Sequence, residues 1–438
     1  MKTTNCFRNF VQYVSLNVLG MIGLSCYILA DTFFVSKGLG TNGLTALNLA
    51  IPIYSFIHGS GLMIGMGGGT QYSILKSQKE DAAANRAFTN AVYLAAVFAV
   101  FFVVVGIFFS GSIVSLFGAD GVVFDMSKTY LQVILLFSPA FLMNNTLLCF
   151  VRNDGAPQLS MAAMIGGSMS NIVLDWVFIF PCKMGIFGAV FATGLAPVIS
   201  MLILSVHFIH RRNRFHFIKC KPEARLLRNI LSSGVPSLVT EVSSGIVIIV
   251  FNAIILKLQG NVGVAAYGVI ANLSLVVIAI YTGIAQGIQP LISRNHGMKN
   301  EKNVKAIFRY AITTMLLLSA FIYTGIFLFA SQITGIFNSE QNQMLQSIAT
   351  QGLRLYFIAC PFAGFNIVLS IYFTSTEHPK PAHMISILRG FAVIIPMAFL
   401  LSFLAQIQGV WCAFPATELL VAIIGLLFYK TVGKRSDT

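Results

Sequence analysis

Four acidic residues lie within long apolar stretches of this chain, where a carboxylate has the most to gain from binding a cation. They are Asp31, Asp175, Glu241 and Glu418. A charged side chain at the centre of a membrane-spanning helix costs about 2.5–3.5 kcal/mol on insertion scales. Such residues are therefore rare, and they usually mark ion or substrate pathways. We take these four carboxylates as the first candidates for functional chemistry.

Two of the four acids share one depth in the first half of the chain. Asp31 and Asp175 each lie six residues before the predicted outer end of their helix, and Thr193 lies five residues after the start of its own. At 1.5 Å per residue, all three lie about 8–9 Å below the outer helix ends. Asn171 precedes Asp175 by one turn and shares its face. We predict that Asp31, Asn171, Asp175 and Thr193 bind a proton or Na+, and no other metal site is predicted.

The second half carries a different set of polar residues. Glu241 lies about seven residues into the seventh predicted span. With Asn144 and Asn366, it is predicted to line a substrate cavity or a second ion site. Arg389 and Glu418 lie in the last two predicted spans. Each buried charge needs a partner, so we expect these two residues to form a structural ion pair.

The composition requires a membrane protein. The 438 residues are 56% hydrophobic and 10% charged, with a mean hydropathy of +0.82, whereas a soluble domain has about 25% charged residues. A bilayer-spanning helix needs about 20 apolar residues. Such stretches predict an all-α polytopic fold with twelve transmembrane helices near residues 13–36, 44–75, 87–110, 127–150, 159–180, 188–210, 234–256, 263–292, 310–330, 347–373, 384–404 and 409–430.

Basic residues indicate how the chain is oriented. With both termini in the cytoplasm, Lys and Arg divide 22 to 4 in favour of the inner side, and only Arg354 and Arg389 fall within spans. This asymmetry is what the positive-inside rule requires. The net charge of +14 therefore reflects topology rather than nucleic-acid binding. We expect a multi-pass protein of the bacterial cytoplasmic (inner) membrane with both termini cytoplasmic and no cleavable signal peptide.

The helical pattern is repeated at an offset of about 220 residues. Gly40 aligns with Gly260, and at a nearly equal offset Asn144 aligns with Asn366. We therefore predict two pseudo-symmetric six-helix lobes, at residues 1–210 and 234–438, joined by a cytoplasmic linker at residues 211–233. Such duplicated bundles are typical of secondary transporters. The intramembrane acids are not duplicated: Asp31, for example, aligns with Phe251. We therefore expect each ion-binding site to lie within one half and to have no counterpart in the other.

These residues resemble the MATE (multidrug and toxic compound extrusion) family, in the branch of DinF-like and MepA-like pumps. The resemblance rests on ILADTFFVSKGLGTNGLTALNLAIPI, VRNDGAPQLSMAAMIGGSMSNIVLDWVFIF and GIAQGIQPLIS. It implies a V-shaped pair of lobes that export lipophilic cations by alternating access, driven by inward H+ or Na+ flow. It places the cation or proton site at Asp31, Asn171, Asp175 and Thr193. Asn366 departs from the NorM-like pattern, in which this position is an Asp, so a complete second Na+ site is not expected.

Two other classes of function compete with an antiporter. A lipid-linked saccharide or lipid flippase should line its cavity with several basic residues, and only two fall in the predicted spans. A membrane-embedded enzyme would need a catalytic set that the seven His residues do not form. We predict an H+-coupled antiporter, since two neighbouring desolvated carboxylates should keep one proton. It should need no cofactor, contact small lipophilic cations and membrane lipids, bind no nucleic acid and act as a monomer.

Overall fold

The computed structural model describes residues 3–119, 121–338 and 341–436, and these residues form helices and connecting loops without a strand. The helices are α1 (Thr3–Ser77), α2 (Asp81–Phe108), α3 (Ser110–Leu116), α4 (Gly121–Leu136), α5 (Ser138–Asn153), α6 (Pro157–Ile179), α7 (Gly185–Ile209), α8 (Ala224–Gly297), α9 (Glu301–Phe337), α10 (Gln343–Tyr356), the 3-10 turn η1 (Phe357–Ala359), α11 (Cys360–Ser375), α12 (Pro379–Ile387), the π-helical turn η2 (Leu388–Ala392) and α13 (Ile394–Ser436).

Most of these helices are long and apolar enough to cross a bilayer. Within the described ranges, eight helices qualify, or nine when α4 and α5, which are bent by 47° relative to each other, are counted as one broken span. Helices suit this environment because they satisfy their backbone hydrogen bonds internally. The predicted all-α membrane fold is confirmed. The count of twelve spans and the two six-helix lobes stay predictions.

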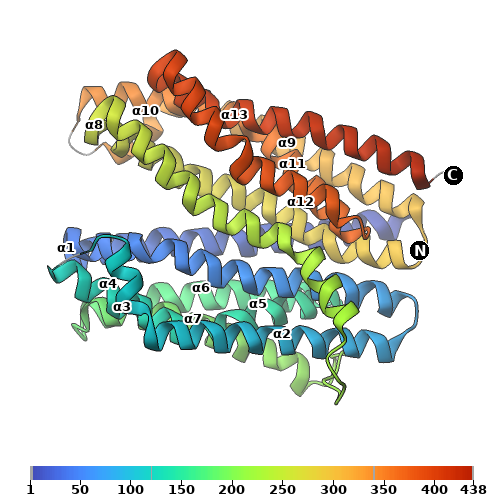
Figure 1. Cartoon of the computed structure of the whole chain (residues 1–438). Helices are drawn as coiled ribbons and strands as arrows, with labels where there is room; N and C mark the ends of the chain where they lie inside the picture. Colours follow the sequence, from blue (N-terminus) through green and yellow to red (C-terminus); the bar gives the residue numbers. More distant parts are fainter. Residues whose placement is uncertain (1–2, 120, 339–340, 437–438) are drawn as a thin grey trace.

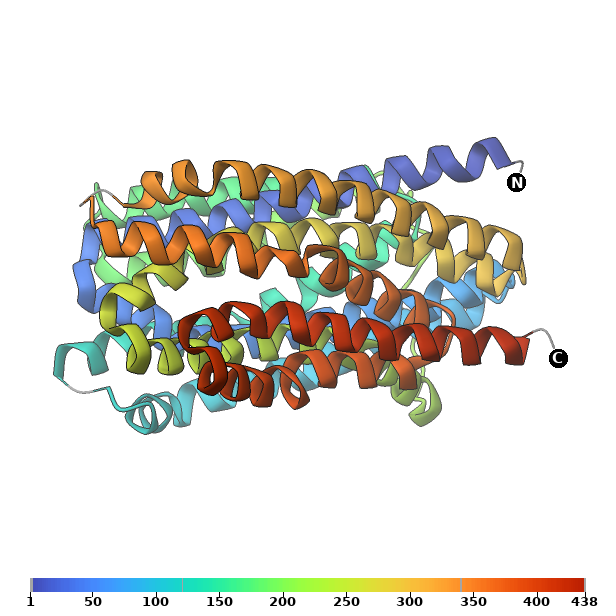
Figure 2. The same ribbon diagram turned by 90° about the horizontal axis from the view of Figure 1, so that it is seen from above.

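Three of the long helices contain a break at which the chain reverses direction. The breaks lie at Gly40 in α1, at Gly260 in α8, and at Ala405 and Gln406 in α13. Figure 1 shows α1 and α8 running to the end of the molecule opposite the chain termini and returning. Both termini lie at the same end of the molecule in Figures 1 and 2.

The internal repeat recurs in the backbone angles at these reversals. Gly40 has φ 66° and ψ −157°, and Gly260 has φ 62° and ψ −156°. This region is essentially restricted to glycine, because a Cβ would clash with the backbone. The helix N-caps that follow are also alike, with Glu80 at φ −91°, ψ 66° and Asn300 at φ −95°, ψ 71°. The two halves of the sequence therefore share turn geometry as well as helical pattern.

Buried apolar side chains form two separate clusters that follow the halves of the sequence. One cluster contains residues between 35 and 230, and the other contains residues between 251 and 421. The second also includes Cys6, Phe10 and Val14 from the first turns of α1. Figure 1 shows the corresponding blue-to-green and yellow-to-red groups of helices. The start of the chain thus packs into the core formed by its second half.

Helices α1 and α8 cross closely in the part of the molecule nearer the termini. The helix backbones meet where Gly67 faces Ile230 and where Gly234 faces the carbonyl of Met63. A Cβ added to Gly283 would come within 2.6 Å of the Val18 backbone. Small residues allow such close approach in membrane bundles. The halves are therefore joined backbone to backbone at this level.

The helix that follows the linker is longer than expected. The sequence placed the seventh span at residues 234–256, but α8 begins at Ala224. The non-helical part of the predicted 211–233 linker is therefore residues 211–223. As a result, Glu241 lies seventeen residues into its helix rather than about seven.

The crossing of α1 and α8 predicts a contrast between two glycines of α8. Gly234→Ala should lower the free energy of unfolding by about 1–3 kcal/mol, because the new methyl group overlaps the Met63 carbonyl. At Gly268, no heavy atom lies within 4 Å of the position that a Cβ would occupy. Gly268→Ala should therefore leave stability unchanged or raise it slightly. Thermal unfolding of the purified protein in detergent measures both changes, and equal losses of stability in the two variants would contradict this packing.

Candidate functional site

The structure brings together the four predicted cation-site residues of the first half. Asp31 on α1, Asn171 and Asp175 on α6, and Thr193 on α7 are all buried. The Asn171 amide, oriented to satisfy its neighbours, donates to Asp175 Oδ2 at 3.1 Å and accepts from the Thr193 backbone N–H at 3.3 Å. Asn171 and Asp175 are one helical turn apart, which explains their contact. The equal depths calculated for the three helices therefore correspond to a real cluster.

The two carboxyl groups of this cluster are neighbours, close enough to influence each other. Two ionised carboxylates side by side away from water repel each other, so such a pair favours a proton on one of them. Oδ1 of Asp31 and Oδ1 of Asp175 have no hydrogen-bond partner within the described part of the chain. Buried unpartnered carboxylate oxygens have a strong electrostatic need for a cation. We call Asp31, Asn171, Asp175 and Thr193 the acid cluster.

The acid cluster offers few oxygen ligands to a metal ion. The Thr193 hydroxyl already donates to the Ala189 carbonyl at 3.1 Å. The Asn171 amide oxygen is engaged by the Thr193 backbone. Two carboxylate oxygens remain unpartnered, which suffices for one or two protons. Na+ would need additional oxygen ligands from water or from a rearranged amide.

A cavity lies beside the acid cluster. Its volume is about 70 Å³, and Thr193 lies at its wall. The Tyr27 hydroxyl is hydrogen-bonded to the Tyr54 hydroxyl at 2.8 Å, and Asn145 Nδ2 is 3.2 Å from His58 Nδ1. All four of these residues line the cavity. Aromatic and amide groups thus surround the space beside the carboxylates.

Two further predicted cavity residues lie near this space. Asn144 lines the cavity, and its Oδ1 has no hydrogen-bond partner among the described residues. Glu241 on α8 faces Gly59 of α1, with its Cβ 3.0 Å from the position that a Cβ of Gly59 would occupy. Its carboxylate forms no ion pair of 4.0 Å or less within the described ranges. Glu241 therefore presents a half-buried negative charge where the two halves meet.

Asn366 does not lie with Glu241, because it belongs to a separate buried network in the second half. Arg389 donates to Glu418 Oε1 through Nε at 3.1 Å and through Nη2 at 2.8 Å. Asn366 Nδ2 donates to Glu418 Oε2 at 2.7 Å. Arg389 lies on the π-helical turn η2, a feature that often occurs at functional sites. The Glu418 carboxylate is thus held by a guanidinium and an amide together.

A buried arginine, Arg152, was not predicted from the sequence. Arg152 lies in the last turn of α5, where the sequence suggests a loop, and its side chain is 1% exposed. Its Nη1 donates to Asn17 Oδ1 at 2.6 Å and to Gln286 Oε1 at 2.9 Å. These partners come from α1 and α8, so the guanidinium joins the two halves. The only indication of this buried arginine in the sequence was its position at the end of an apolar run.

A second network of neutral side chains joins the halves beside Arg152. Asn153 Nδ2 donates to Gln289 Oε1 at 2.9 Å, and Gln289 Nε2 donates to Thr70 Oγ1 at 2.9 Å. Ser73 donates to Asn153 Oδ1 at 2.6 Å. Gln289 lies on α8 and the others lie on α1 and α5. Such amide and hydroxyl contacts can be made and broken without leaving a buried charge.

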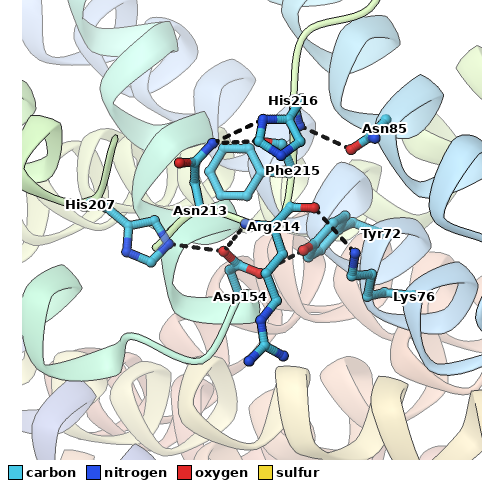
Figure 3. Close-up of polar contacts among 9 residues, drawn as sticks. All are labelled: Tyr72, Lys76, Asn85, Asp154, His207, Asn213, Arg214, Phe215 and His216. Atoms are coloured by element: carbon cyan, nitrogen blue, oxygen red, sulfur yellow. Dashed lines mark hydrogen bonds and ion pairs between the residues drawn. The ribbon is translucent and has the colours of Figure 1, made fainter. Parts of the chain in front are cut away.

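Asp154 attaches the linker to the first half (Figure 3). Its Oδ1 accepts from Tyr72 Oη at 2.6 Å, and its Oδ2 lies 2.9 Å from His207 Nε2 and accepts from the Arg214 backbone N–H at 2.8 Å. Lys76 Nζ donates to the Arg214 carbonyl at 3.2 Å. Residues from α1, the α5–α6 turn, α7 and the linker thus converge on one carboxylate.

The linker is a docked segment rather than a free loop. Phe215 is fully buried, and its ring centroid lies 4.7 Å from that of Phe88 and 5.6 Å from that of Phe150. The His216 backbone N–H donates to Asn85 Oδ1 at 2.9 Å, as Figure 3 also shows. An aromatic anchor and backbone hydrogen bonds therefore hold the segment against α2 and α5.

The fold and the acid cluster define a polytopic helical membrane protein with a buried group of carboxyl and amide side chains. A family model described as MatE matches residues 18–177 and 236–400, and the chain belongs to the MatE family. The chain is 25% identical over 426 residues to the multidrug export protein MepA of Staphylococcus saprophyticus, covering 97% of this chain and 93% of MepA. For MepA of Staphylococcus aureus the identity is 24% over 423 residues, covering 96% and 93%. The predicted resemblance is confirmed.

Solved structures show the same fold. A multidrug resistance MATE family transporter in an outward-facing conformation superposes with a TM-score of 0.92 at 23% identity, covering 100% of this chain and 99% of that chain. MATE in complex with MaL6 gives a TM-score of 0.93 at 23% identity, with both chains covered completely. The chain belongs to a family of membrane transporters, and the alternative of a membrane-embedded enzyme is therefore wrong.

The network in the second half predicts how its charges depend on each other. Arg389→Met should lower the free energy of unfolding by about 3–5 kcal/mol, since it leaves the Glu418 carboxylate buried without a countercharge. Adding Glu418→Gln should restore much of this loss, because the amide oxygen can still accept from Asn366. Thermal unfolding of both single variants and the double variant gives the coupling energy. Additive effects of the two substitutions would show that the charges do not interact.

Proposed function

We propose that this protein is a cation-coupled antiporter that exports lipophilic, mostly cationic compounds across the cytoplasmic membrane by alternating access, with H+ as the coupling ion. The observation that carries the proposal is the pair of neighbouring buried carboxylates, Asp31 and Asp175, in one half. Inward movement of a proton onto this pair would be exchanged for outward movement of substrate. Membership of the MatE family and the multidrug export relatives support this role.

The choice of H+ over Na+ follows from the available ligands. The acid cluster leaves two carboxylate oxygens unpartnered, and the second half has Asn366 engaged by Glu418. Two unpartnered carboxylate oxygens suit protons directly, whereas Na+ would also draw on hydroxyl, amide or water oxygens. If Na+ binds, Asp31, Asn171 and Asp175 are its proposed ligands. No cofactor is invoked.

The proposed architecture has twelve membrane crossings in two six-helix lobes. The nine candidate spans, with α1, α8 and α13 each divided at its break, correspond to this count. We assign residues 1–210 and 234–438 to the lobes and residues 211–233 to the connection between them. The two hydrophobic cores and the repeated turn at Gly40 and Gly260 support this division.

The proposed orientation puts both termini in the cytoplasm, in accordance with the basic residues. The close crossing of α1 and α8 then lies on the cytoplasmic side, so that the halves are joined there. This is the arrangement expected of an outward-facing state. The similar fold of an outward-facing MATE transporter supports the assignment.

The proposed substrates are small lipophilic cations. Glu241 supplies a half-buried negative charge between the halves, and Tyr27, Tyr54 and Phe141 line the cavity beside it. Aromatic faces attract cations, and apolar walls accept varied shapes. The protein is proposed to act as a monomer surrounded by membrane lipids and without nucleic acid.

A lipid-linked saccharide or lipid flippase is the second candidate function, and Arg152 is the observation that favours it. This arginine lines the cavity, so the cavity contains a basic residue that the sequence did not place there. One buried arginine is still few for a pyrophosphate group. Of the two basic residues counted in spans, Arg389 is paired with Glu418, and Arg354 is exposed with its guanidinium 5.1 Å from the ring centroid of Phe327.

Substitution of the acid cluster tests the antiporter proposal. Asp31→Asn and Asp175→Asn should each abolish uphill dye efflux while leaving expression intact, because an amide cannot take up and release the coupling proton. Asp125→Asn, which alters an exposed carboxylate on α4, is the matched control and should transport normally. Accumulation of a fluorescent lipophilic cation in everted vesicles, where export appears as uptake into the lumen, measures the change. Normal efflux by both cluster variants would remove the acid cluster from the mechanism.

The identity of the coupling ion can be tested separately in proteoliposomes. In Na+-free buffer, an imposed pH gradient should drive substrate transport, since the acid cluster has sites for protons. A Na+ gradient without a pH gradient should drive none. Transport that is absent at every pH gradient and restored by Na+ would reverse the assignment of the ion, while leaving Asp31 and Asp175 as its ligands.

A further inference from the structure

Arg152 leaves one edge of its guanidinium without an oxygen partner. Nη1 makes both strong hydrogen bonds, to Asn17 and Gln286. Nη2 contacts only sulfur atoms, Met66 Sδ at 3.4 Å and Cys149 Sγ at 3.4 Å, and thioether and thiol sulfurs are weak acceptors. Nε has no hydrogen-bond partner in the described part of the chain. The Nε–Nη2 edge is therefore unfilled.

The same edge of another buried arginine shows what usually fills it. In Arg389, Nε and Nη2 both donate to the carboxylate of Glu418, at 3.1 Å and 2.8 Å. Two parallel N–H groups of this kind match the geometry of an anionic group. Arg152 presents the same donors with a side chain that is 1% exposed. It differs from Arg389 in lacking the anion.

No carboxylate of the described residues compensates the charge of Arg152. No ion pair within 4.0 Å includes it. A buried charge without a partner is penalised by several kcal/mol. Asn17 and Gln286 lessen that penalty through their amide dipoles but carry no charge. A bound anion would remove most of it.

Arg152 lies at the wall of the cavity described above. Arg152, Cys149 and Gln286 line the cavity together with Ser200. The Ser200 hydroxyl is buried and also lacks a hydrogen-bond partner among the described residues. A hydroxyl is a donor suited to an anion. The cavity volume of about 70 Å³ is sufficient for one small anionic group.

We propose that the Nε–Nη2 edge of Arg152 binds a single negatively charged group. That group is either a small inorganic anion or the carboxylate of a molecule that enters the cavity. Because the partners of Arg152 come from both halves, occupation of this site acts where the halves are joined. The site is distinct from the acid cluster and adds an anion to a protein otherwise proposed to handle cations. It does not depend on the antiporter proposal, since it is tested by binding alone.

The first experiment measures the melting temperature of the purified full-length protein as the concentration of sodium chloride, sulfate or benzoate is raised from a low starting value. Ligands that bind the folded protein stabilise it by linkage. Each anion that binds should raise the melting temperature of the wild type in a saturable manner. Arg152→Gln should abolish the rise, and Arg152→Lys should retain a reduced one, since lysine keeps the charge but not the paired donors. Arg354→Gln removes an exposed arginine and should respond like the wild type.

The second experiment distinguishes a free anion from a carboxylate carried by a larger molecule. Rhodamine 110 has a free carboxylate, and rhodamine 123 is its methyl ester. If the group belongs to the molecule that enters, the wild type should bind the acid at least tenfold more tightly relative to the ester than Arg152→Gln does. If only small anions enter, chloride should raise the melting temperature and the dyes should show no such difference.

Two outcomes would overturn the proposal. In the first, wild-type protein shows neither an anion-dependent melting temperature nor a preference for the acid dye. This result needs no variant, so an unstable Arg152→Gln protein does not affect it. In the second, Arg152→Gln folds and keeps the anion response of the wild type. Either result leaves the dye efflux of the acid cluster variants unaffected.

Discussion

The structure depends on one constraint: a charge placed among apolar helices must be neutralised. The chain meets this constraint in three ways. Arg389 and Glu418 neutralise each other at 2.8 Å. Asp31 and Asp175 are buried as neighbours, an arrangement that favours a proton on one of them. Arg152 is surrounded by neutral amides and sulfur atoms. The first solution is permanent, whereas the second and third leave room for a ligand that comes and goes.

This difference separates the structural charges from the functional ones. An internal ion pair is satisfied in every state of the protein, so it can stabilise one half while that half moves as a body. A carboxylate pair that favours a bound proton makes the local structure sensitive to pH. The acid cluster lies within one half, but Arg152 and Glu241 lie where the halves meet. The proposed ion site and the contact between the halves are therefore located in different places, with Thr193 and Arg152 both at the wall of the cavity.

The contact between the halves combines close helix packing with neutral polar groups. Glycines at positions 67 and 234 let α1 and α8 approach backbone to backbone. The hydrogen bonds beside them link Asn153, Gln289 and Thr70. Such contacts are short enough to hold the halves together and weak enough to exchange for water. Meanwhile Asp154 and Phe215 fix the linker to the first half, so that movement must occur beyond the docked segment, in or after the start of α8.

The sequence by itself determined the class of the molecule, because hydropathy and charge asymmetry depend only on composition along the chain. It also predicted the repeat and the acid cluster. Glycines that adopt positive φ recur at Gly40 and Gly260, and helix rise converts residue number into depth. Asp31, Asp175 and Thr193 could therefore be placed in one layer without coordinates.

Tertiary structure alone decided which side chains at similar depth touch. Asn366 forms a hydrogen bond with Glu418 rather than with Glu241. The direction in which a side chain points depends on how its helix is rotated about its axis, and hydropathy carries no information about that rotation. Arg152 and Asp154 lie near the end of α5, where the sequence does not distinguish a membrane-spanning helix from a loop. Their burial follows from α1, α7, α8 and the linker packing over them, a result of long-range contacts that no local pattern contains.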